Sequence, residues 1–476
     1  MDNSTHRLKV GLFSIGLESY WKQFPGLKKK LESYINIVGT RMSEFGEEVI
    51  DIGIIDTPQK AMDAGHRFRK ADVDIIFLYV TTYALSSSVL PVVQRAKVPV
   101  IILNLSPEAS IDYAGFNGLA NRTTMTGEWL SFCAACPVPE IANVFKRANI
   151  PFYEITGMLH EEDSWVKARE WIDAARVANV MAHNRLGAMG HYYSGMLDIY
   201  TDLTLQLATF GGHIEMIEVD ELSALRKTIT QPEIENRCKY FKQVFDIQAD
   251  CEPGALEEAA RTSLAMDALV DKYALGSMAY YYNGIPGSEN EKSIASIILG
   301  NSLLTARGIP VAGEYEIKNA QAMKIMDAFD AGGSFTEYYA MDYTDDVVLM
   351  GHDGPGHIKI SEGKTKVRPL NVYHGKVSHG LSVEMAVRYG PVTCLSVIEH
   401  NGKLGLLVAE GESVTGPILE IGNTNSRYRF PIGARAFVQQ WNSHGPAHHC
   451  AVGVGHIASK IDKLGKFLAI DTVKIC

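Results

Sequence analysis

Short apolar runs alternate with longer amphipathic segments over the first third of the chain. Runs rich in β-branched residues occupy positions 10–15, 49–55, 73–80, 98–103 and 152–156. Amphipathic segments typical of helices lie between them at 59–69, 84–96 and 139–148. Continuous apolar strands that alternate with helices are typical of a parallel sheet covered on both faces. The pattern therefore predicts a Rossmann-like, doubly wound domain over residues 1–170.

A second α/β pattern follows. A helix is expected at 163–184, strands at 213–219 and 277–282, and further helices at 233–244, 255–273 and 291–307. This alternation predicts a second parallel-sheet domain over residues 171–332.

The pattern changes after Gly332, where helical periodicity fades and short apolar runs lie between Gly and Asn turns. These runs, at 346–350, 393–399, 404–410 and 418–421, are expected to be strands. The sequence His-Asn-Gly-Lys at 400–403 is a hairpin signal between two of them. Residues 333–476 are therefore predicted to form an antiparallel β-barrel domain.

Composition and charge exclude several classes of protein. The net charge of −10 and the absence of a basic run longer than Lys28-Lys29-Lys30 argue against a nucleic-acid partner. No apolar stretch reaches the roughly 18 to 20 residues that span a bilayer, so no membrane partner is expected. Residues 1–7 lack the charged, apolar, small-residue order of a signal peptide, which predicts a cytoplasmic protein.

Cysteine and glycine spacing give little sign of redox or nucleotide chemistry. Seven cysteines, an odd number, favour reduced thiols over a disulfide framework. The pair Cys133 and Cys136 lacks a second ligand pair, and we interpret it as two small residues in a buried segment. Gly11 and Gly16 are not followed by a third glycine at dinucleotide-site spacing, so no nicotinamide cofactor is expected.

Candidate chemistry is concentrated late in the chain, where nine of the fifteen histidines lie between His352 and His456. Glu314 ends an apolar run directly after a glycine, and Glu337 is flanked by aromatic residues. A carboxylate in such surroundings stays ionised only when it is paired, hydrogen-bonded or metal-bound. His352 follows a predicted strand, and the pair at 448–449 follows Gly-Pro-Ala.

Two carboxylates and two imidazoles form the mixed oxygen and nitrogen set that a borderline divalent ion such as Mn²⁺ accepts. Each of these residues alone is more often an ordinary surface or core residue. His357 is interpreted as a loop histidine. Tyr192 and Tyr193, in the segment 189–196, are either pocket or packing residues, with packing the commoner role.

Four motifs resemble, in order and spacing, the metal-binding motifs of the L-arabinose/L-fucose isomerase family. They are Gly-Glu-Tyr-Glu-Ile-Lys at 313–318, Gly-Ser-Phe-Thr-Glu at 333–337, Met-Gly-His at 350–352 and Ala-His-His at 447–449. Weaker similarity lies at 155–157, 416–417 and 422–427. The resemblance runs in order along nearly the whole chain but is dense only from Gly313 onward.

The resemblance implies an aldose–ketose isomerase that uses an enediol intermediate. It also implies two Rossmann-like domains, one N-terminal and one central, followed by a C-terminal β-barrel. It implies that Glu314, Glu337, His352 and His449 bind Mn²⁺, with His448 left open as the alternative to His449. Glu314 and Glu337 would also be the catalytic residues that divide the proton transfers, in an order left open. The family further implies a homohexamer whose sites lie between subunits. Which residues of the neighbouring subunit complete each site is left open.

The sequence departs from the family where the sugar is recognised. After His352 it reads Asp-Gly-Pro-Gly-His, where L-arabinose isomerases have a Leu-Glu-Val-Cys-Pro-Ser type of stretch. The family's glutamine after the first strand has no match, and its N-domain histidine is replaced near 121–122. The sugar substrate is therefore left open. Two other functions remain open: a metal-dependent hydrolase that uses the same ligands, and a non-catalytic sugar-binding or regulatory protein.

Overall fold

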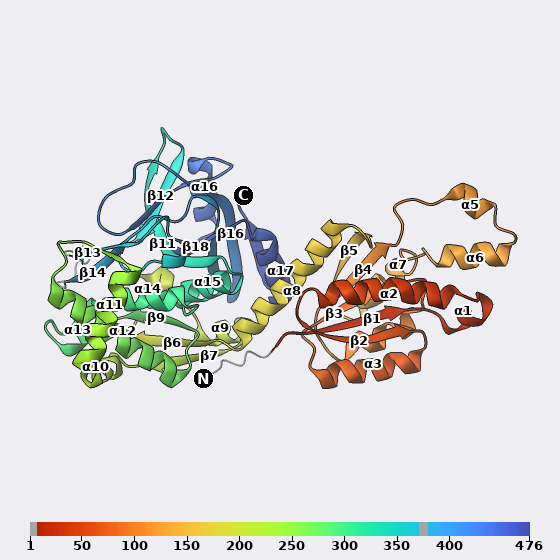
Figure 1. Ribbon diagram of the computed structural model, residues 1–476, viewed down its shortest axis with the longest axis horizontal. Coiled ribbons are helices and arrows are strands. Elements are labelled where there is room, and N and C mark those ends of the chain that lie inside the picture. The colour runs from red at the N-terminus through yellow and green to blue at the C-terminus, as the bar shows by residue number, and fades with distance from the viewer. Residues whose placement is uncertain (1–6, 371–378) are drawn as a thin grey trace. The chain divides into compact units, whose positions relative to one another are not determined.

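The structure is a computed structural model that describes residues 7–370 and 379–476 (Figure 1). The chain divides into two compact units, Met1–Asn179 and Val180–Cys476. Residues 1–6, which carry most of the signal-peptide interpretation, lie outside the described part of the chain. Within that part, no helix combines the length and the apolar character needed to cross a bilayer.

The first unit contains a five-stranded parallel sheet with the strand order β2-β1-β3-β4-β5. Its strands are β1 (Lys9–Ile15), β2 (Glu48–Ile55), β3 (Ile75–Tyr79), β4 (Val100–Ser106) and β5 (Phe152–Met158). All five strands predicted for this region are confirmed. Helices α2 (Leu27–Ser43) and α3 (Pro58–Ala71) lie on opposite sides of the sheet in Figure 1, which explains why every residue of β3 is buried.

Helix α3 has capping residues at both of its ends. Helix α3 begins after Thr57, whose side chain accepts a hydrogen bond from the backbone N–H of Lys60, and ends at Asp72 in the left-handed conformation. The other helical segments are α1 (Glu18–Gln23), η1 (Ser86–Ser88), α4 (Leu90–Gln94), α5 (Tyr113–Asn117), α6 (Arg122–Leu130), α7 (Val138–Arg147) and α8 (Glu162–Ala182). The helix predicted at 84–96 is wrong as a single element. Pro91 lies at the start of α4, where a proline is tolerated, and cannot continue a longer helix.

Cys133 and Cys136 form a disulfide in the segment between α6 and α7. Cys133 is buried and Cys136 is exposed. The expectation of two reduced thiols in a buried segment is therefore wrong for this pair. The turn brings their Cα atoms to 5.7 Å, within the range that a disulfide spans. The five other cysteines are free thiols, as predicted.

The second unit begins with a four-stranded parallel sheet in the order β10-β9-β6-β7. Its strands are β6 (Arg185–Gly190), β7 (His213–Ile217), β9 (Ser277–Tyr281) and β10 (Val311–Ala312). The sequence pattern predicts β7 and β9 but not β6, which contains Gly, Ala and Met in place of β-branched residues. A smaller sheet, β14-β13-β8, joins β8 (Asp246–Ile247), β13 (Lys366–Leu370) and β14 (Gly380–Glu384).

Helices pack around this sheet. They are η2 (Leu197–Ile199), α9 (Leu203–Phe210), α10 (Val219–Thr228), α11 (Gln231–Val244), α12 (Pro253–Tyr273), α13 (Glu289–Ala295), α14 (Ile298–Ala306) and α15 (Ile317–Ala328). The helix predicted at 291–307 is interrupted between α13 and α14. The hydroxyl of Ser296 donates to the backbone carbonyl of Lys292 at 2.6 Å, and such side-chain bonds compete with helix continuation.

Six antiparallel strands near the C-terminus close into a barrel in the order β15-β18-β11-β12-β17-β16, with β16 pairing back onto β15. They are β11 (Gly332–Asp342), β12 (Val347–His352), β15 (Gly390–His400), β16 (Lys403–Val414), β17 (Thr424–Arg429) and β18 (His449–Val454). Strand β19 (Asp471–Lys474) pairs in parallel with β16. The remaining helices are η3 (Ile358–Ile360), α16 (Ala434–Ser443) and α17 (Ala458–Leu468).

The barrel confirms part of the strand prediction. The hairpin at 400–403 is confirmed, since His400 pairs with Lys403. The strand predicted at 418–421 is wrong: this segment is irregular and lies between Pro417, which has no backbone N–H, and Gly422 in a positive-φ conformation. The α/β class with parallel sheets and a C-terminal antiparallel barrel is thus confirmed. The Rossmann-like detail and the boundaries at 170 and 332 stay predictions.

Candidate metal centre

Glu314 lies just beyond the carboxyl end of the central parallel sheet. Strand β10 ends at Ala312, and both Glu314 and Tyr315 then adopt left-handed backbone conformations, with φ of 58° and 63°. Such conformations are strained for non-glycine residues and are characteristic of functional sites. The backbone N–H of Tyr315 donates to the carbonyl of Tyr280 at 2.9 Å and fixes this turn. The fold therefore places the Glu314 carboxylate at the strand end, as the sequence predicts.

Three neighbouring barrel strands supply the other predicted residues. Glu337 lies on β11, His352 is the last residue of β12, and His449 is the first residue of β18. Strand β11 lies between the other two, and Glu337 pairs with Gly351 on one side and with His449 on the other. This register brings the three side chains to one end of the barrel.

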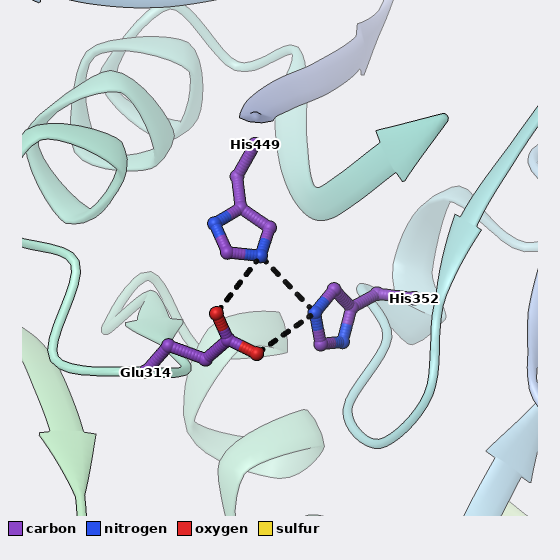
Figure 2. Close-up of side chains that lie close together, drawn as sticks. All are labelled: Glu314, His352 and His449. Atoms are coloured by element: carbon purple, nitrogen blue, oxygen red, sulfur yellow. Dashed lines mark hydrogen bonds and ion pairs between the residues drawn. The ribbon is translucent and has the colours of Figure 1, made fainter. Parts of the chain in front are cut away.

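The side chains of Glu314, His352 and His449 converge, as Figure 2 shows. The Nε2 atoms of His352 and His449 are 3.2 Å apart. The Glu314 carboxylate lies 3.5 Å from Nε2 of His449 and 4.0 Å from Nε2 of His352. The candidate ligand atoms of these three residues all lie within 4.8 Å of one another.

Glu337 joins the same cluster through a second group. Its carboxylate and ring nitrogens of His448 and His449 also lie within 4.8 Å of one another. His449 is common to both groups. The structure thus brings together all four residues that the family resemblance implies, with His448 beside them.

A buried carboxylate that the sequence reasoning did not single out orients His449. Glu316 is 1% exposed and shares a short hydrogen bond with Nδ1 of His449. Burial raises the pKa of Glu316 to about 8, which favours a protonated carboxyl group near neutral pH. When Glu316 is ionised and accepts the Nδ1 proton of a neutral His449, the lone pair of Nε2 faces His352 and Glu314, and a cation at this position would favour that state. Carboxylate–imidazole pairs of this kind fix metal-binding histidines in proteins.

His448 has a different environment. Its Nδ1 donates to Oδ2 of Asp198 at 2.6 Å, and its backbone N–H donates to the same oxygen at 2.9 Å. Burial opposes the charged imidazolium, but the contacts with Glu314 and Asp198 outweigh it and raise the pKa of His448 to about 9. A protonated imidazole donates hydrogen bonds and cannot bind a metal through that nitrogen. These contacts favour His449 over His448 as the ligand.

The two glutamates have pKa values shifted in opposite directions. Burial opposes ionisation of Glu314, but the contact with His448 and the charges of His449 and His352 lower its pKa below the ordinary value. Burial raises the pKa of Glu337, and the nearby histidines only partly offset this. Paired carboxyl groups whose environments separate their pKa values are typical of acid–base sites.

These groups face a cavity of about 420 Å³. Its other walls are mainly aromatic or apolar and include Tyr193, Met196, Tyr280, Tyr281, Ile294, Phe335 and Pro355. Tyr193 and Met196 therefore line a pocket, whereas Tyr192 packs between Tyr200 and Tyr315. Asp353 and Pro355, from the segment that departs from the family, also line this cavity.

His357 lies in a loop, as expected, but its side chain is buried. It is 3% exposed, and neither ring nitrogen has a hydrogen-bond partner in the described residues. Burial lowers its pKa to about 4. Its backbone N–H lies 3.4 Å from the hydroxyl of Ser334, so the segment after His352 turns inward against β11.

The donor set fits a divalent cation. Oε2 of Glu314 is buried and accepts no hydrogen bond within the described part of the chain, although basic nitrogens surround it. Imidazole nitrogen and carboxylate oxygen together suit Mn²⁺ and similar borderline ions. No model of a known protein family matches the chain, and no curated protein matches it.

Proposed function

We propose that the chain is a divalent-metal-dependent isomerase that interconverts an aldose and a ketose through an enediol. The observation that carries the proposal is the pair of glutamates with opposite pKa shifts, which face one cavity beside a cluster of three histidines. The motif resemblance to L-arabinose isomerases, which includes both glutamates and His352, supports the same reaction class.

Glu314, Glu337, His352 and His449 are the residues that would hold the cation, with Mn²⁺ as the proposed ion. A bound divalent cation supplies Lewis acidity, which lowers the pKa of sugar hydroxyls and polarises the carbonyl. The hydrogen bond with Glu316 orients the imidazole of His449 before any cation binds.

The chain's own residues perform the proton transfers. Conversion of an aldose to a ketose removes the proton on C2 and returns one to C1, while a second proton passes from the C2 hydroxyl to the oxygen on C1. Glu314, which favours the ionised form, and Glu337, which favours the protonated form, provide one acceptor and one donor for these two transfers. General acid–base catalysis of this kind contributes about 10² to 10⁴-fold in rate.

The remaining cavity residues position the sugar and exclude water. The protonated His448 presents Nε2 at 3.5 Å from Glu314 and donates toward oxygens beside it. The aromatic rings of Tyr193 and Tyr281, which lie 4.5 Å apart, line the same cavity. Polar groups together with aromatic rings match a sugar, which has both hydroxyl groups and apolar C–H faces.

The test is a panel of aldoses and ketoses incubated with chelator-treated protein, with and without added Mn²⁺, and analysed for the epimeric or isomeric products. The expected result is ketose formation from at least one aldose only when Mn²⁺ is present. Hydrolysis without ketose formation would replace the proposal with a metal-dependent hydrolase. Sugar binding without turnover would instead identify a binding or regulatory protein. The homohexamer implied by the resemblance stays a proposal that analytical ultracentrifugation tests.

A further inference from the structure

A second cavity, of about 650 Å³, lies in the same unit and shares one helix with the candidate metal centre. Its walls come from the end of α10, the first turns of α12, α13 with the following Ser296, and His379 and Gly380 at the start of β14. On α13, Ile294 lines the cavity at the metal centre, whereas Lys292 and Ala295 line this second cavity. We call it the α13 cavity.

The α13 cavity carries more positive than negative charge, although the whole chain has a net charge of −10. Its charged lining residues are four cations, Arg226, Lys227, Arg261 and Lys292, and three anions, Glu258, Glu289 and Glu291. Each carboxylate already has a donor: Glu258 binds Arg226, Glu289 binds Lys292, and Glu291 accepts from the backbone N–H of Gly287. Lys227 is exposed and forms no ion pair with the described residues. Arg261 also pairs with Glu258, at 3.7 Å, so among these four cations Lys227 is the one without a carboxylate partner in the described part of the chain.

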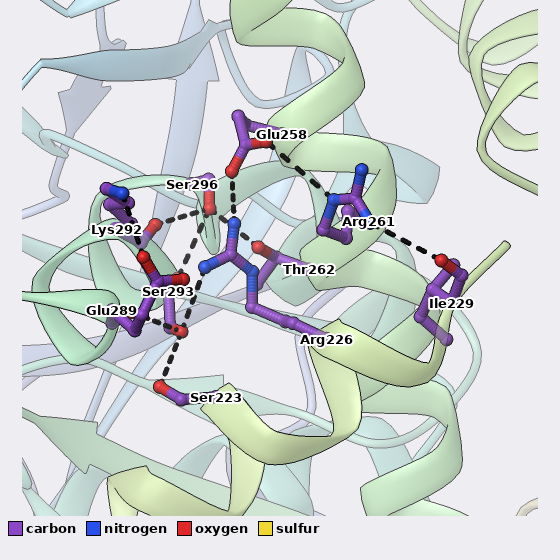
Figure 3. Close-up of polar contacts among 10 residues, drawn as sticks. All are labelled: Ser223, Arg226, Ile229, Glu258, Arg261, Thr262, Glu289, Lys292, Ser293 and Ser296. Atoms are coloured by element: carbon purple, nitrogen blue, oxygen red, sulfur yellow. Dashed lines mark hydrogen bonds and ion pairs between the residues drawn. The ribbon is translucent and has the colours of Figure 1, made fainter. Parts of the chain in front are cut away.

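Arg226 lies at the centre of this charged group, in contact with Glu258 and Ser293, as Figure 3 shows. It is 3% exposed, and its NH1 donates to the hydroxyl of Ser293 at 3.1 Å. Ser293 lies 2.8 Å from the hydroxyl of Ser223, so buried hydroxyl groups fix the guanidinium in place. Its Nε has no hydrogen-bond partner within the described part of the chain. A buried, oriented guanidinium with an unsatisfied donor is an arrangement typical of anion recognition.

The N-terminus of α12 adds a further source of positive potential. This helix has 21 residues, and no side chain caps its N-terminus. Gly254 and Ala255, in its first turn, line the α13 cavity. The backbone N–H of Ala255 already donates to the carbonyl of Glu252 at 3.0 Å, so the contribution of α12 to anion binding comes from the helix dipole and the backbone N–H of Gly254.

We propose that the α13 cavity binds the phosphoryl group of a small metabolite and that α13 links this ligand to the wall of the sugar cavity. A phosphoryl group offers several acceptor oxygens, which match the donors of Arg226, Arg261 and Lys227 together with the backbone N–H of Gly254. The α13 cavity is larger than a lone phosphate ion, and its volume suits a phosphorylated small molecule. Because α13 is a single short helix, a ligand that orders Lys292 also restricts Ile294 on the other side.

Binding is tested on full-length, metal-free protein by isothermal titration with pyrophosphate. Wild-type protein is expected to bind with a Kd of about 1 mM or tighter. Lys227→Gln and Arg261→Gln are each expected to weaken binding about tenfold, the value of one charge-assisted contact. Lys239→Gln, an exposed lysine on α11 outside the cavity, removes the same charge and should leave the Kd unchanged.

Two outcomes would overturn the binding site. One is no heat of binding at about 10 mM pyrophosphate, well above the expected Kd. The other is equal weakening in Lys227→Gln and in the Lys239→Gln control, which would show a general charge effect. Melting curves of each variant show whether it is folded.

The link through α13 is tested by hydrogen exchange on the same metal-free protein. Saturating pyrophosphate is expected to slow amide exchange in residues 289–296 at least about threefold, because local opening is suppressed when a ligand binds. Unchanged exchange in this segment at saturation would overturn the link. Neither measurement requires turnover, so their outcome is independent of the proposed isomerase activity.

Discussion

Nε2 of His352 and Nε2 of His449 lie 3.2 Å apart, and the other nitrogen of each ring, Nδ1, has a hydrogen-bond partner of its own. Nδ1 of His352 donates to the backbone carbonyl of Asp353 at 2.7 Å, and Nδ1 of His449 binds Glu316. When Glu316 is ionised, both imidazole protons lie on Nδ1 and two lone pairs face each other beside the Glu314 carboxylate. A cation among these atoms would stabilise that state, and the first three predictions concern it.

The first prediction concerns metal-linked stability. Mn²⁺ should raise the melting temperature of chelator-treated protein, because an ion that binds only the folded state stabilises it by about 2.7 kcal/mol at 100 times its Kd. Chelation should also abolish turnover. Differential scanning calorimetry with and without Mn²⁺ measures the shift. His352→Gln should lose it, and His400→Gln, on the barrel hairpin, should keep it. An identical melting temperature of the wild type in both conditions would contradict the metal site.

The second prediction separates proton transfer from metal binding at the two glutamates. Glu314→Gln and Glu337→Gln keep the size and one oxygen ligand but cannot accept and return a proton. At saturating Mn²⁺, each should lower kcat at least about 10²-fold, the lower end for a general acid–base group. The exposed Glu235→Gln on α11 is the matched control and should keep normal kcat. Near-normal kcat in either cavity variant removes that glutamate from the proton pathway.

The third prediction assigns a positioning role to Glu316. Glu316→Gln should weaken Mn²⁺ affinity about 10- to 100-fold, since it loosens control of the His449 tautomer. In contrast to the two catalytic variants, its kcat should recover when Mn²⁺ is raised to saturation. Metal titrations followed by calorimetry and by rate measure both quantities. An unchanged Mn²⁺ affinity would show that the buried pair only stabilises the fold.

The fourth prediction concerns stability in mild acid. The pKa of His357 is about 4 in the folded protein and near 6.5 when unfolded, so the unfolded state binds more protons between these values. The folded state should therefore lose stability as pH falls from 6.5 to 4, by an amount on the order of 3 kcal/mol from this residue. Urea unfolding of metal-free wild type and His357→Gln across this range measures the difference. Parallel pH dependences in the two proteins would contradict the assignment.

The fifth prediction concerns the sugar. Asp353 and Pro355 line the cavity in a segment that departs from the L-arabinose isomerase pattern. We therefore expect L-arabinose not to have the highest kcat/KM among common pentoses and hexoses. A panel of sugars measured under identical Mn²⁺ saturation tests this. If L-arabinose ranks first, the replaced segment has no effect on specificity.

The sequence predicts the elements whose burial is visible in local composition. Strand β3 is apolar along its whole length because both faces are covered, so it is easily recognised. Strand β6 is equally buried at its centre but contains Leu, Gly, Ala and Met, which have no strong strand preference. The break between α13 and α14 depends on side-chain hydrogen bonds at Ser296, which a hydrophobic pattern does not reveal.

The same distinction holds in the site. Glu314 and His352 follow apolar runs at strand ends, so their positions are visible in the sequence. Asp198 acts only through His448, which is 250 residues away in the sequence, and no local signal marks it. Glu316 lies two residues after Glu314, and this spacing is the one signal that could have identified it.

Barrel closure also dictates when the site can exist during synthesis. Strand β18 lies between β15 and β11, and its first residue, His449, is 133 residues from Glu316 in the sequence. A nascent chain that has not yet released β18 has an open barrel and an incomplete ligand set. Loop closure over such distances is slow, and the last strand must insert between two strands that have already emerged. Binding of the proposed metal would therefore be a late step of maturation, and a chain truncated before residue 449 lacks one of the four proposed ligands.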